Sequence, residues 1–297
     1  MNQQILLSII VLLLFIASLA TYKFLRRKQH CMELLAKIAK MEEKYKGVLV
    51  KDKNGFDMLL VRDDDSVTRL MVEDNEWEPH LQNAFRQIIK PKAKVLVLGG
   101  HFGTHVILIS KLVGNQGKLS VFEANPNSLK FLNANLVLNN VENTTLYPKA
   151  AFSKKTTLSF VALATGNTGS SHIKREEDNS NTNIITVDAV NIDSIPEIDT
   201  IDVLQMDIEG AEADAVYGAT KLIDKSPNLI VFQEWTPAWI KDKDSYLNFW
   251  RSRGYKIGQI TAHDLCEITD EELKNAEQID IILAKNLDKI ILNFKPM

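Results

Sequence analysis

The chain has 297 residues, 45% hydrophobic and 25% charged, which is typical of a globular protein with one large core. Its formal net charge of −3 provides no overall basic field, so a nucleic acid is not an expected partner. The two cysteines, Cys31 and Cys266, are far apart in the sequence, which argues against a disulfide framework or a cysteine-based zinc site.

An uncharged apolar run occupies residues 5–22. As a helix it would be about 27 Å long at ~1.5 Å per residue, close to the ~30 Å hydrocarbon core of a bilayer. A cleaved signal peptide would need positive charge before the run and small residues after it, and neither is present. We therefore prefer an uncleaved transmembrane anchor to a signal peptide, and a buried soluble helix is the weakest of the three interpretations.

The charge on the two flanks of this run predicts its orientation. Lys or Arg follows it at positions 23, 26, 27 and 28, whereas neither precedes it. Because positive flanks stay on the cytoplasmic side, we expect the N-terminus outside and the bulk of the chain in the cytoplasm. Residues 1–28 are thus predicted to form a single-pass membrane anchor with a basic flank.

Residues 29–75 are predicted to form an amphipathic helix and a small β segment. Apolar residues recur at helical spacing from Cys31 to Lys46. This helix could pack on the domain that follows it, on a second copy of the chain or on the membrane surface. Two short strands around an Asn54–Gly55 turn should follow, and a third short strand is expected at residues 67–72.

Strands and helices alternate through residues 76–297, which are predicted to form the main domain. A helix is expected over 76–90, where Pro91 ends it. The alternation predicts an α/β fold that is Rossmann-like, with a mostly parallel seven-stranded sheet and helices on both faces. Further strands are expected at 94–99, 118–123, 144–152, 201–207, 228–235, 255–260 and 280–286, and further helices at 101–113, 125–140, 210–224 and 244–254.

A glycine-rich turn followed by an acid is the strongest local signal. One strand ends in Gly99, Gly100 and Gly103, and Glu123 ends the next strand. In dinucleotide-type folds such glycines let the backbone approach a ligand, and an acid about 20 residues later binds the ribose hydroxyls. A turn that only links strand to helix, or a nicotinamide enzyme, would also fit. The G-G-x-x-G spacing argues against the nicotinamide enzyme.

Five segments follow one another in a specific order over nearly half of the chain. They are VLVLGGHFG, VFEANPNSLKFLNANLVLNN, GNTGSSHI, IDVLQMDIEGAEADAVYGATKLI and NLIVFQEW. This order resembles that of the FkbM-type methyltransferase family, and the Asp-Ile-Glu-Gly-Ala-Glu stretch is its most specific piece. The resemblance implies a class I methyltransferase fold and methyl transfer from the cofactor S-adenosylmethionine, commonly to a hydroxyl of a sugar or small metabolite.

The resemblance also implies, by position, which residues bind the cofactor. The glycine turn would line its methionine part, and the acid after the second strand would bind its ribose. Residues directly after that acid and after the third strand would flank its adenine. The residues so assigned are Gly99, Gly100, His101, Gly103, Glu123, Ala124, Asn125 and Ala151.

Two positions of the glycine turn depart from the family pattern. The family has an Asp and an Asn where this chain has Val97 and His101. A polar anchor for the amino group of the cofactor is thus missing. A non-catalytic, membrane-tethered binding or scaffold protein is therefore the alternative to an enzyme.

Acidic residues after the fourth strand are candidates for the chemistry. A hydroxyl acceptor needs a base, and the carboxyl edge of a parallel sheet faces the cofactor crevice. We expect Asp207 to act as the base or to orient the acceptor. Glu209 would support it or cap the helix that begins near Gly210. His172, in a polar loop, is a third candidate as base or substrate ligand, although a surface histidine would look the same.

No metal ligand is assigned from the sequence. Asp207 and Glu234 could share a divalent cation, because oxygen ligands suit magnesium, but no dense acidic cluster in the sequence demands one. His101 and His105 lie one helical turn apart, yet no zinc motif surrounds them. Packing or cofactor contact is the expected role of both histidines.

The expected acceptor is the hydroxyl of a small molecule or a glycolipid. Trp235 and Trp239 follow the fifth strand and could stack on a sugar face, although burial in the core is the commoner fate of tryptophan. The predicted anchor favours a membrane-derived acceptor, because it would keep the enzyme at the bilayer.

Overall fold

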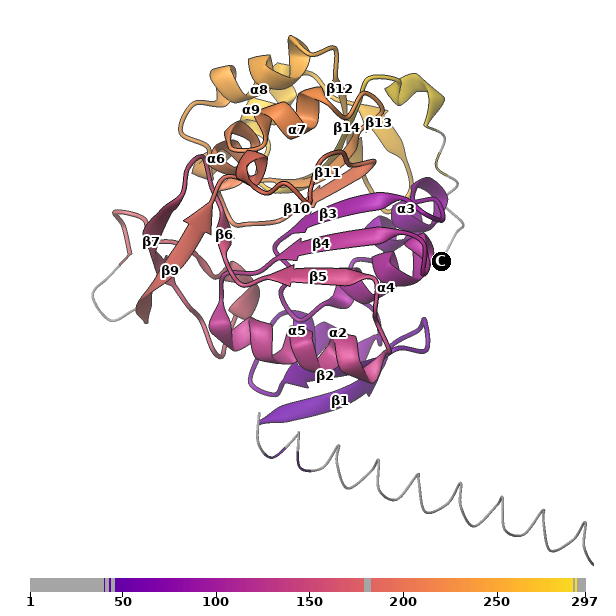
Figure 1. Cartoon of the computed structure of the whole chain (residues 1–297), viewed down its shortest axis with the longest axis vertical. Helices are drawn as coiled ribbons and strands as arrows, with labels where there is room; N and C mark the ends of the chain where they lie inside the picture. Colours follow the sequence, from indigo (N-terminus) through magenta and orange to yellow (C-terminus); the bar gives the residue numbers. More distant parts are fainter. Residues whose placement is uncertain (1–39, 41–42, 44–45, 179–182, 291, 293–297) are drawn as a thin grey trace, which may run out of the picture. The chain divides into compact units, whose positions relative to one another are not determined.

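The computed structural model describes residues 40, 43, 46–178, 183–290 and 292. The chain divides into two units, Met1–Leu49 and Val50–Met297, of which the second holds the sheet (Figure 1). The predicted anchor and nearly all of the predicted amphipathic helix lie outside the described residues. None of the helices that the structure describes has the length and apolar composition needed to cross a bilayer. Residues 50–75 fall in the second unit, and the domain boundaries predicted from the sequence stay predictions.

Within the described residues, eight strands form one large sheet (Figure 1). In spatial order they are β13 (Leu265–Glu267), β12 (Lys256–Ile260), β14 (Ile279–Ala284), β11 (Ile230–Trp235), β10 (Val203–Met206), β3 (Lys94–Leu98), β4 (Lys118–Phe122) and β5 (Thr144–Tyr147). The strands from β11 to β5 run parallel, which confirms the predicted Rossmann-like α/β class. The prediction of seven strands was wrong, because the short edge strand β13 pairs antiparallel with β12. The three residues of β13 are too few to show the alternation of apolar and polar side chains that predicts a strand.

A second, four-stranded sheet within the described residues was not predicted. In spatial order its strands are β6 (Ala150–Ala151), β9 (Ile184–Val190), β7 (Thr156–Val161) and β8 (His172–Ile173). The strand predicted at 144–152 is therefore divided between β5 of the large sheet and β6 of the small one. The two strands are separated by Pro148, which has no N–H to donate. A turn follows in which the N–H of Lys149 donates to the backbone oxygen of Tyr147.

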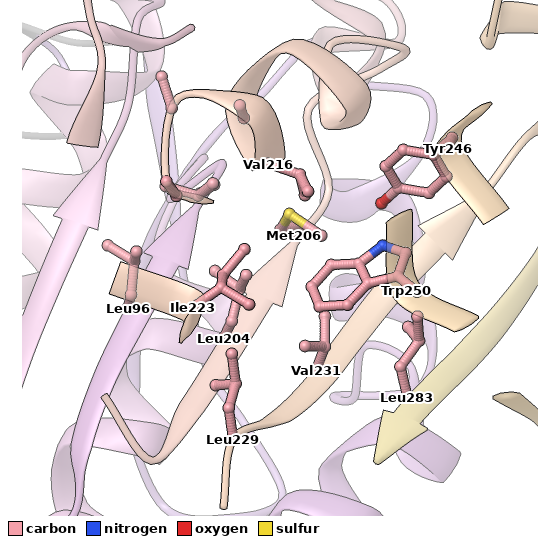
Figure 2. Close-up of a cluster of buried hydrophobic side chains, with 14 of the residues drawn as sticks. Leu96, Leu204, Met206, Val216, Ile223, Leu229, Val231, Tyr246, Trp250 and Leu283 are labelled. Atoms are coloured by element: carbon pink, nitrogen blue, oxygen red, sulfur yellow. The ribbon is translucent and has the colours of Figure 1, made fainter. Parts of the chain in front are cut away.

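Helices cover both faces of the large sheet, as predicted (Figure 1). One face packs on α3 (Pro79–Ile88), α4 (Thr104–Val113) and α5 (Pro126–Leu138). The other packs on α6 (Glu212–Tyr217), α7 (Thr220–Asp224), α8 (Lys243–Arg251) and α9 (Asp270–Asn275). Figure 2 shows the second core, where Trp250 of α8 lies among Met206, Val231 and Leu283 of the strands.

Residues 67–73 form helix α2 (Val67–Glu73), so the strand predicted at 67–72 was wrong. The side-chain Oδ1 of Asp64 accepts the N–H groups of Ser66 and Thr68, which stabilises the start of the helix. The buried residues Val67, Thr68 and Met71 lie at helical spacing. Six residues are too few to distinguish that spacing from a strand pattern.

The helix predicted at 210–224 is divided into α6 and α7. A Cβ on Gly218 would lie 2.0 Å from the backbone oxygen of Phe152. This close approach of a neighbouring chain segment explains both the glycine and the break in the helix. The helix predicted at 76–90 is also shorter, since α3 begins at Pro79 and its cap residue Glu78 has a φ of +46°.

Two asparagine side chains of α5 hold strand β2 (Asp57–Val61), which follows β1 (Gly47–Lys51) after the predicted Asn54–Gly55 turn. The amide of Asn135 accepts the N–H of Leu59 at 2.7 Å and donates to its oxygen at 2.9 Å. Asn139 makes the same pair of bonds with the backbone of Asp57. Side chains thus satisfy backbone groups of β2 that a neighbouring strand would otherwise bind.

Candidate active site

The carboxyl ends of the parallel strands surround a cavity of about 250 Å³. In open α/β sheets this is the edge where ligands bind. The predicted site residues that line it are Gly99, Gly100, His101, Glu123, Ala124, Ala151, Asp207 and Glu209. Gly103, Asn125 and His172 are absent from its lining, although the structure describes all three.

A Cβ added to any glycine of the turn would meet protein atoms. A Cβ on Gly99 would come within 1.9 Å of the backbone oxygen of Asp207, and the residue has a φ of +88°. A Cβ on Gly100 would lie 2.7 Å from the side chain of Val121. On Gly103, which has a φ of +92°, a Cβ would lie 2.8 Å from Leu132. The turn is therefore packed tightly against β4, α5 and the end of β10.

Glu123 is buried at the end of β4 and holds the glycine turn. One of its carboxylate oxygens accepts the N–H of His101, and the other accepts the N–H of Asn125, both at 2.7 Å. Burial raises the pKa of Glu123 to about 7, although these donated hydrogen bonds act in the opposite direction. A carboxylate oxygen has two lone pairs, so both oxygens can still accept hydrogen bonds from the cavity.

Asn125 holds the 163–171 segment, a loop that lines the cavity, rather than a ligand. Its side-chain oxygen caps α5 by accepting the N–H of Asn127 at 2.9 Å. Its NH₂ group donates to the backbone oxygen of Leu163 and to the hydroxyl of Ser171, both at 2.9 Å. The residue is 1% exposed, and both the oxygen and the NH₂ group of its side chain have protein partners.

A chain of hydrogen bonds links His101 to the 163–171 segment and to residues before α2. The imidazole Nε2 lies 2.9 Å from the hydroxyl of Thr168, which donates to the buried carboxylate of Asp64 at 2.5 Å. Burial lowers the pKa of His101 to about 4, so the ring is neutral and its Nε2–H is the donor to Thr168. Backbone bonds between Gly166 and residues 63 and 65 reinforce the link.

An apolar wall lies next to Glu123. It combines the start of the second sheet with the residues directly after β4, and its members are Phe122, Ala124, Ala150, Ala151, Phe160 and Ile173. A planar aromatic group fits between small and aromatic side chains of this kind. The wall therefore supports adenine binding beside the ribose-binding carboxylate.

Three carboxylates gather at the other end of the cavity. Oxygen atoms of Asp207, Glu209 and Glu234 all lie within 4.8 Å of one another. Burial, with the nearby charges of Glu234 and Glu209, raises the pKa of Asp207 well above its usual range. Burial also raises the pKa of Glu209 to about 8 and that of Glu234 to about 7. The sequence expectation that no dense acidic cluster forms here is therefore corrected.

Glu209 does not cap the helix that follows it. Its backbone has a φ of +55°, and the N-cap residue of α6 is Ala211, which has no side-chain cap bond. The carboxylate of Glu212 accepts the N–H groups of Ile208 and Gly210, in the turn before the helix, at 3.1 and 3.3 Å. The Arg175 guanidinium donates to the backbone oxygen of Glu209 at 2.6 Å and lies 4.2 Å from the ring centroid of Trp239. The Glu209 carboxylate is thus free to serve the cavity.

His172 is not brought to the carboxylates. Its Nδ1 lies 2.7 Å from the backbone oxygen of Ser170, and its Nε2 lies 3.1 Å from the carboxylate of Asp178. Because both ring nitrogens have partners and the residue is outside the cavity lining, the structure gives it no position as a base. Its neighbours Ser171 and Ile173 line the cavity instead.

The remaining candidates from the sequence, Trp235, Trp239 and His105, differ in their surroundings. Trp235 is fully buried and donates to the backbone oxygen of Leu273 at 2.7 Å, whereas Trp239 lines the cavity. His105 lies 3.3 Å from the carboxylate of Glu78, and burial lowers its pKa to about 3, so it is neutral. It packs against Phe85 rather than forming a metal pair with a second histidine.

Sequence reasoning missed several residues that line the cavity. Trp77 and Glu78 come from the chain before α3, and Gln205 comes from the middle of β10. The only hint in the sequence that Gln205 belongs to a site is its polar side chain among the apolar residues of a strand. Nothing in the sequence linked Trp77 and Glu78 to a site so far along the chain.

The strand order and the acid after β4 define a Rossmann-like methyltransferase domain. A family model described as the methyltransferase FkbM domain matches residues 98–257, more than half of the chain. The chain belongs to the FkbM methyltransferase family, and the protein is an S-adenosylmethionine-dependent methyltransferase. The resemblance seen in the sequence is thereby confirmed.

Two solved structures are similar to the chain at low identity. A precorrin-6y C5,15-methyltransferase from Geobacter metallireducens is 14% identical, with 70% of this chain and 89% of that chain covered and a TM-score of 0.40. An S-adenosylmethionine-dependent methyltransferase from Aquifex aeolicus is 12% identical, with 74% and 93% covered and a TM-score of 0.41. A search of curated proteins finds no significant match.

The residues of the cavity fit the cofactor of the family. Glu123 has lone pairs left for two ribose hydroxyls, and the apolar wall suits adenine. Val97, where the family has an Asp, is fully buried in the core between the sheet and the helices, so it cannot serve as an anchor for the cofactor. His101, where the family has an Asn, lines the cavity as a neutral ring.

Proposed function

We propose that this enzyme transfers the methyl group of S-adenosylmethionine to a hydroxyl of a sugar or another small acceptor. The observation that carries this proposal is the cluster of Asp207, Glu209 and Glu234 in the cavity that also holds the cofactor residues. Carboxylates accept hydrogen bonds from hydroxyl groups, and Trp77 and Trp239 in the same lining suit contact with a sugar face.

The bound cofactor supplies an electrophilic methyl group on a sulfonium, so the protein has to position the acceptor and remove a proton. Asp207 is the candidate base, because it follows β10 directly beside the glycine turn. Burial and the neighbouring carboxylates raise its pKa, so its carboxylate, once ionised, accepts a proton more readily than one in water. Glu209 and Glu234 would orient the acceptor hydroxyls.

The acceptor is proposed to be membrane-derived, with a glycolipid hydroxyl as one form. Support comes from the uncharged run at 5–22 and from the basic residues that follow it. Together they favour a single-pass anchor with the catalytic domain on the cytoplasmic side. The acidic end of the cavity disfavours a polyanionic acceptor such as a nucleic acid.

Mass spectrometry of membrane lipids and small metabolites tests the reaction. Cells making the full chain, fed with methyl-labelled S-adenosylmethionine precursor, should gain one labelled methyl on a hydroxylated compound. Asp207→Asn should abolish that product while S-adenosylhomocysteine binding persists, whereas the exposed Asp188→Asn should retain the product. Full activity of Asp207→Asn would reject Asp207 as the base.

The orientation is tested with the exposed thiol of Cys266. In a Cys31→Ser variant it is the single cysteine of the chain, since the sequence has two. A maleimide that cannot cross membranes should label it only after intact cells are permeabilised. Labelling of intact cells would contradict a cytoplasmic catalytic domain.

A further inference from the structure

Asp207, Glu209 and Glu234 come together from two adjacent strands. Residues of β10 and β11 pair in parallel, with Met206 opposite Gln233, so Asp207 and Glu234 follow at the same level of the sheet. Glu209 joins them through the turn at Glu209 and Gly210, where both φ angles are positive. The result is a set of carboxylate oxygens within 4.8 Å of one another.

Among the residues that the structure describes, only the charge of Arg175 acts favourably on this cluster, through Glu209 and without a salt bridge. In the described part of the chain, no salt bridge involves any of the three. The nearby Arg175 donates to a backbone oxygen and lies over Trp239. The amide of Gln278 donates to Glu234, which leaves its charge in place. Three acids this close and partly buried repel one another unless a cation or protons are bound.

An independent observation at the same place is the side chain of Gln205. It lies two residues before Asp207, on the same face of β10, and lines the same cavity. The residue is 5% exposed, and its Oε1 is buried without a hydrogen-bond partner. An unsatisfied buried acceptor is costly and is normally explained by a missing ion or water.

We propose that Asp207, Glu209 and Glu234 bind a divalent cation, with the carbonyl oxygen of Gln205 completing the oxygen donor set. All four donors are oxygens, which favours Mg²⁺ or Mn²⁺ over zinc, whose sites usually contain histidine or cysteine. Mg²⁺ sites commonly keep positions for water and substrate. If the proposed function holds, such a position would take an acceptor hydroxyl, which points to acceptors with neighbouring oxygens, such as sugar diols.

Titration of the full chain in detergent with Mn²⁺, followed by electron paramagnetic resonance, tests the site without relying on activity. The protein should remove one equivalent of free Mn²⁺ signal, and added Mg²⁺ should compete. Glu234→Gln and Asp207→Asn should weaken Mn²⁺ binding about tenfold or more. Glu271→Gln, an exposed acid on α9, is the matched control and should bind as the parent does.

Binding of S-adenosylhomocysteine by each variant shows that its fold is intact. A parent protein that leaves the Mn²⁺ signal unchanged, or a Glu234→Gln variant that binds as tightly as the parent, would overturn the cation site. Methyl transfer measured with and without a chelator separates this outcome from the proposed function. Undiminished transfer in chelator together with absent Mn²⁺ binding would reject the cation and retain the function. Mn²⁺ binding without any hydroxyl product would retain the cation site and reject the function.

Discussion

The backbone oxygen of Asp207 occupies the place beside Gly99 where any other residue would carry its Cβ. A Cβ there would lie 1.9 Å from that oxygen, and the N–H of Asp207 donates to the oxygen of Leu98 at 3.0 Å. Gly99 is the first residue of the glycine turn, and Asp207 is the first of the three clustered carboxylates. Their contact therefore fixes the two halves of the site relative to each other.

Replacing Gly99 by alanine should therefore disrupt the site. The substitution combines an unfavourable positive φ with a backbone clash that no side-chain rotation can relieve. Gly55→Ala is the matched control, because Gly55 has a φ of +84° and nothing within 4 Å of its added Cβ. In urea denaturation, we expect Gly55→Ala to cost about 1–2 kcal/mol of unfolding free energy, and Gly99→Ala to cost at least ~2 kcal/mol more. Equal losses would show that the clash is relieved cheaply.

The affinity for S-adenosylhomocysteine should depend on the ionisation of Glu123. Burial raises the pKa of this group to about 7 in the free protein, and a carboxylate accepts ribose hydroxyls better than a carboxylic acid does. Calorimetric Kd values should thus fall by about tenfold in all as pH rises from 6 to 8, most of it below the pKa.

Two variants identify the group responsible for this pH dependence. Glu123→Gln should bind more weakly and with a Kd that is nearly independent of pH. Glu234→Gln should keep the pH dependence, although burial also raises the pKa of Glu234 to about 7. The same slope in Glu123→Gln as in the parent would assign the titration to another residue.

Glu209→Gln should stabilise the protein at alkaline pH when cations are chelated. Its folded-state pKa of about 8 lies above the usual 4.5, so the folded state holds the proton more tightly. That contribution to stability is complete below pH 4.5 and is lost as pH rises through about 8. Since the side chain is only partly buried, we expect a gain of about 1–2 kcal/mol at pH 8 and little at pH 5.

Thermal unfolding in chelator at the two pH values checks this prediction. A kcal/mol corresponds to about 2–4 °C in Tm for a domain of this size. The exposed Glu271→Gln should show no such difference between pH values. If Glu209→Gln raised the Tm as much at pH 5 as at pH 8, the difference in stability from the parent would come from packing and not from charge.

Thr168→Val should loosen the 163–171 segment. The change removes the hydroxyl between His101 and Asp64 and leaves the buried Asp64 carboxylate with one partner fewer. We expect a loss of about 1–3 kcal/mol of unfolding free energy and faster amide exchange at Asp65 and Gly166. The exposed Thr157→Val of β7 is the control. Unchanged exchange at these amides would show that backbone bonds alone hold the segment.

The sequence predicted those parts of the fold and site that depend on local pattern. Glu123 and Asp207 each come directly after a strand with an apolar run. Because these strands are parallel, both residues lie at the carboxyl edge of the large sheet. The glycine turn was recognised as well, but the protein atoms that pack against its glycines were not. Only the three-dimensional register of β3 and β10 reveals the carbonyl beside Gly99.

Contacts distant in sequence could not be predicted. The hydrogen bond between Thr168 and Asp64 joins residues 104 positions apart, and nothing in the sequence pairs the two. The cluster was underestimated because Glu209 reaches it through a positive φ that a single sequence does not encode. Likewise, His172 was favoured by residue type, and its bond to Asp178 depends on how the loop folds back.

The position of β14 matters for anyone who shortens this chain. The family match ends at residue 257, within β12, yet β14 lies between β11 and β12 and comes only afterwards in the sequence. A protein trimmed to the matched region would lack that central partner and expose the hydrogen-bonding edge of β11. Such an open edge promotes self-association, so soluble fragments should extend at least through Ala284.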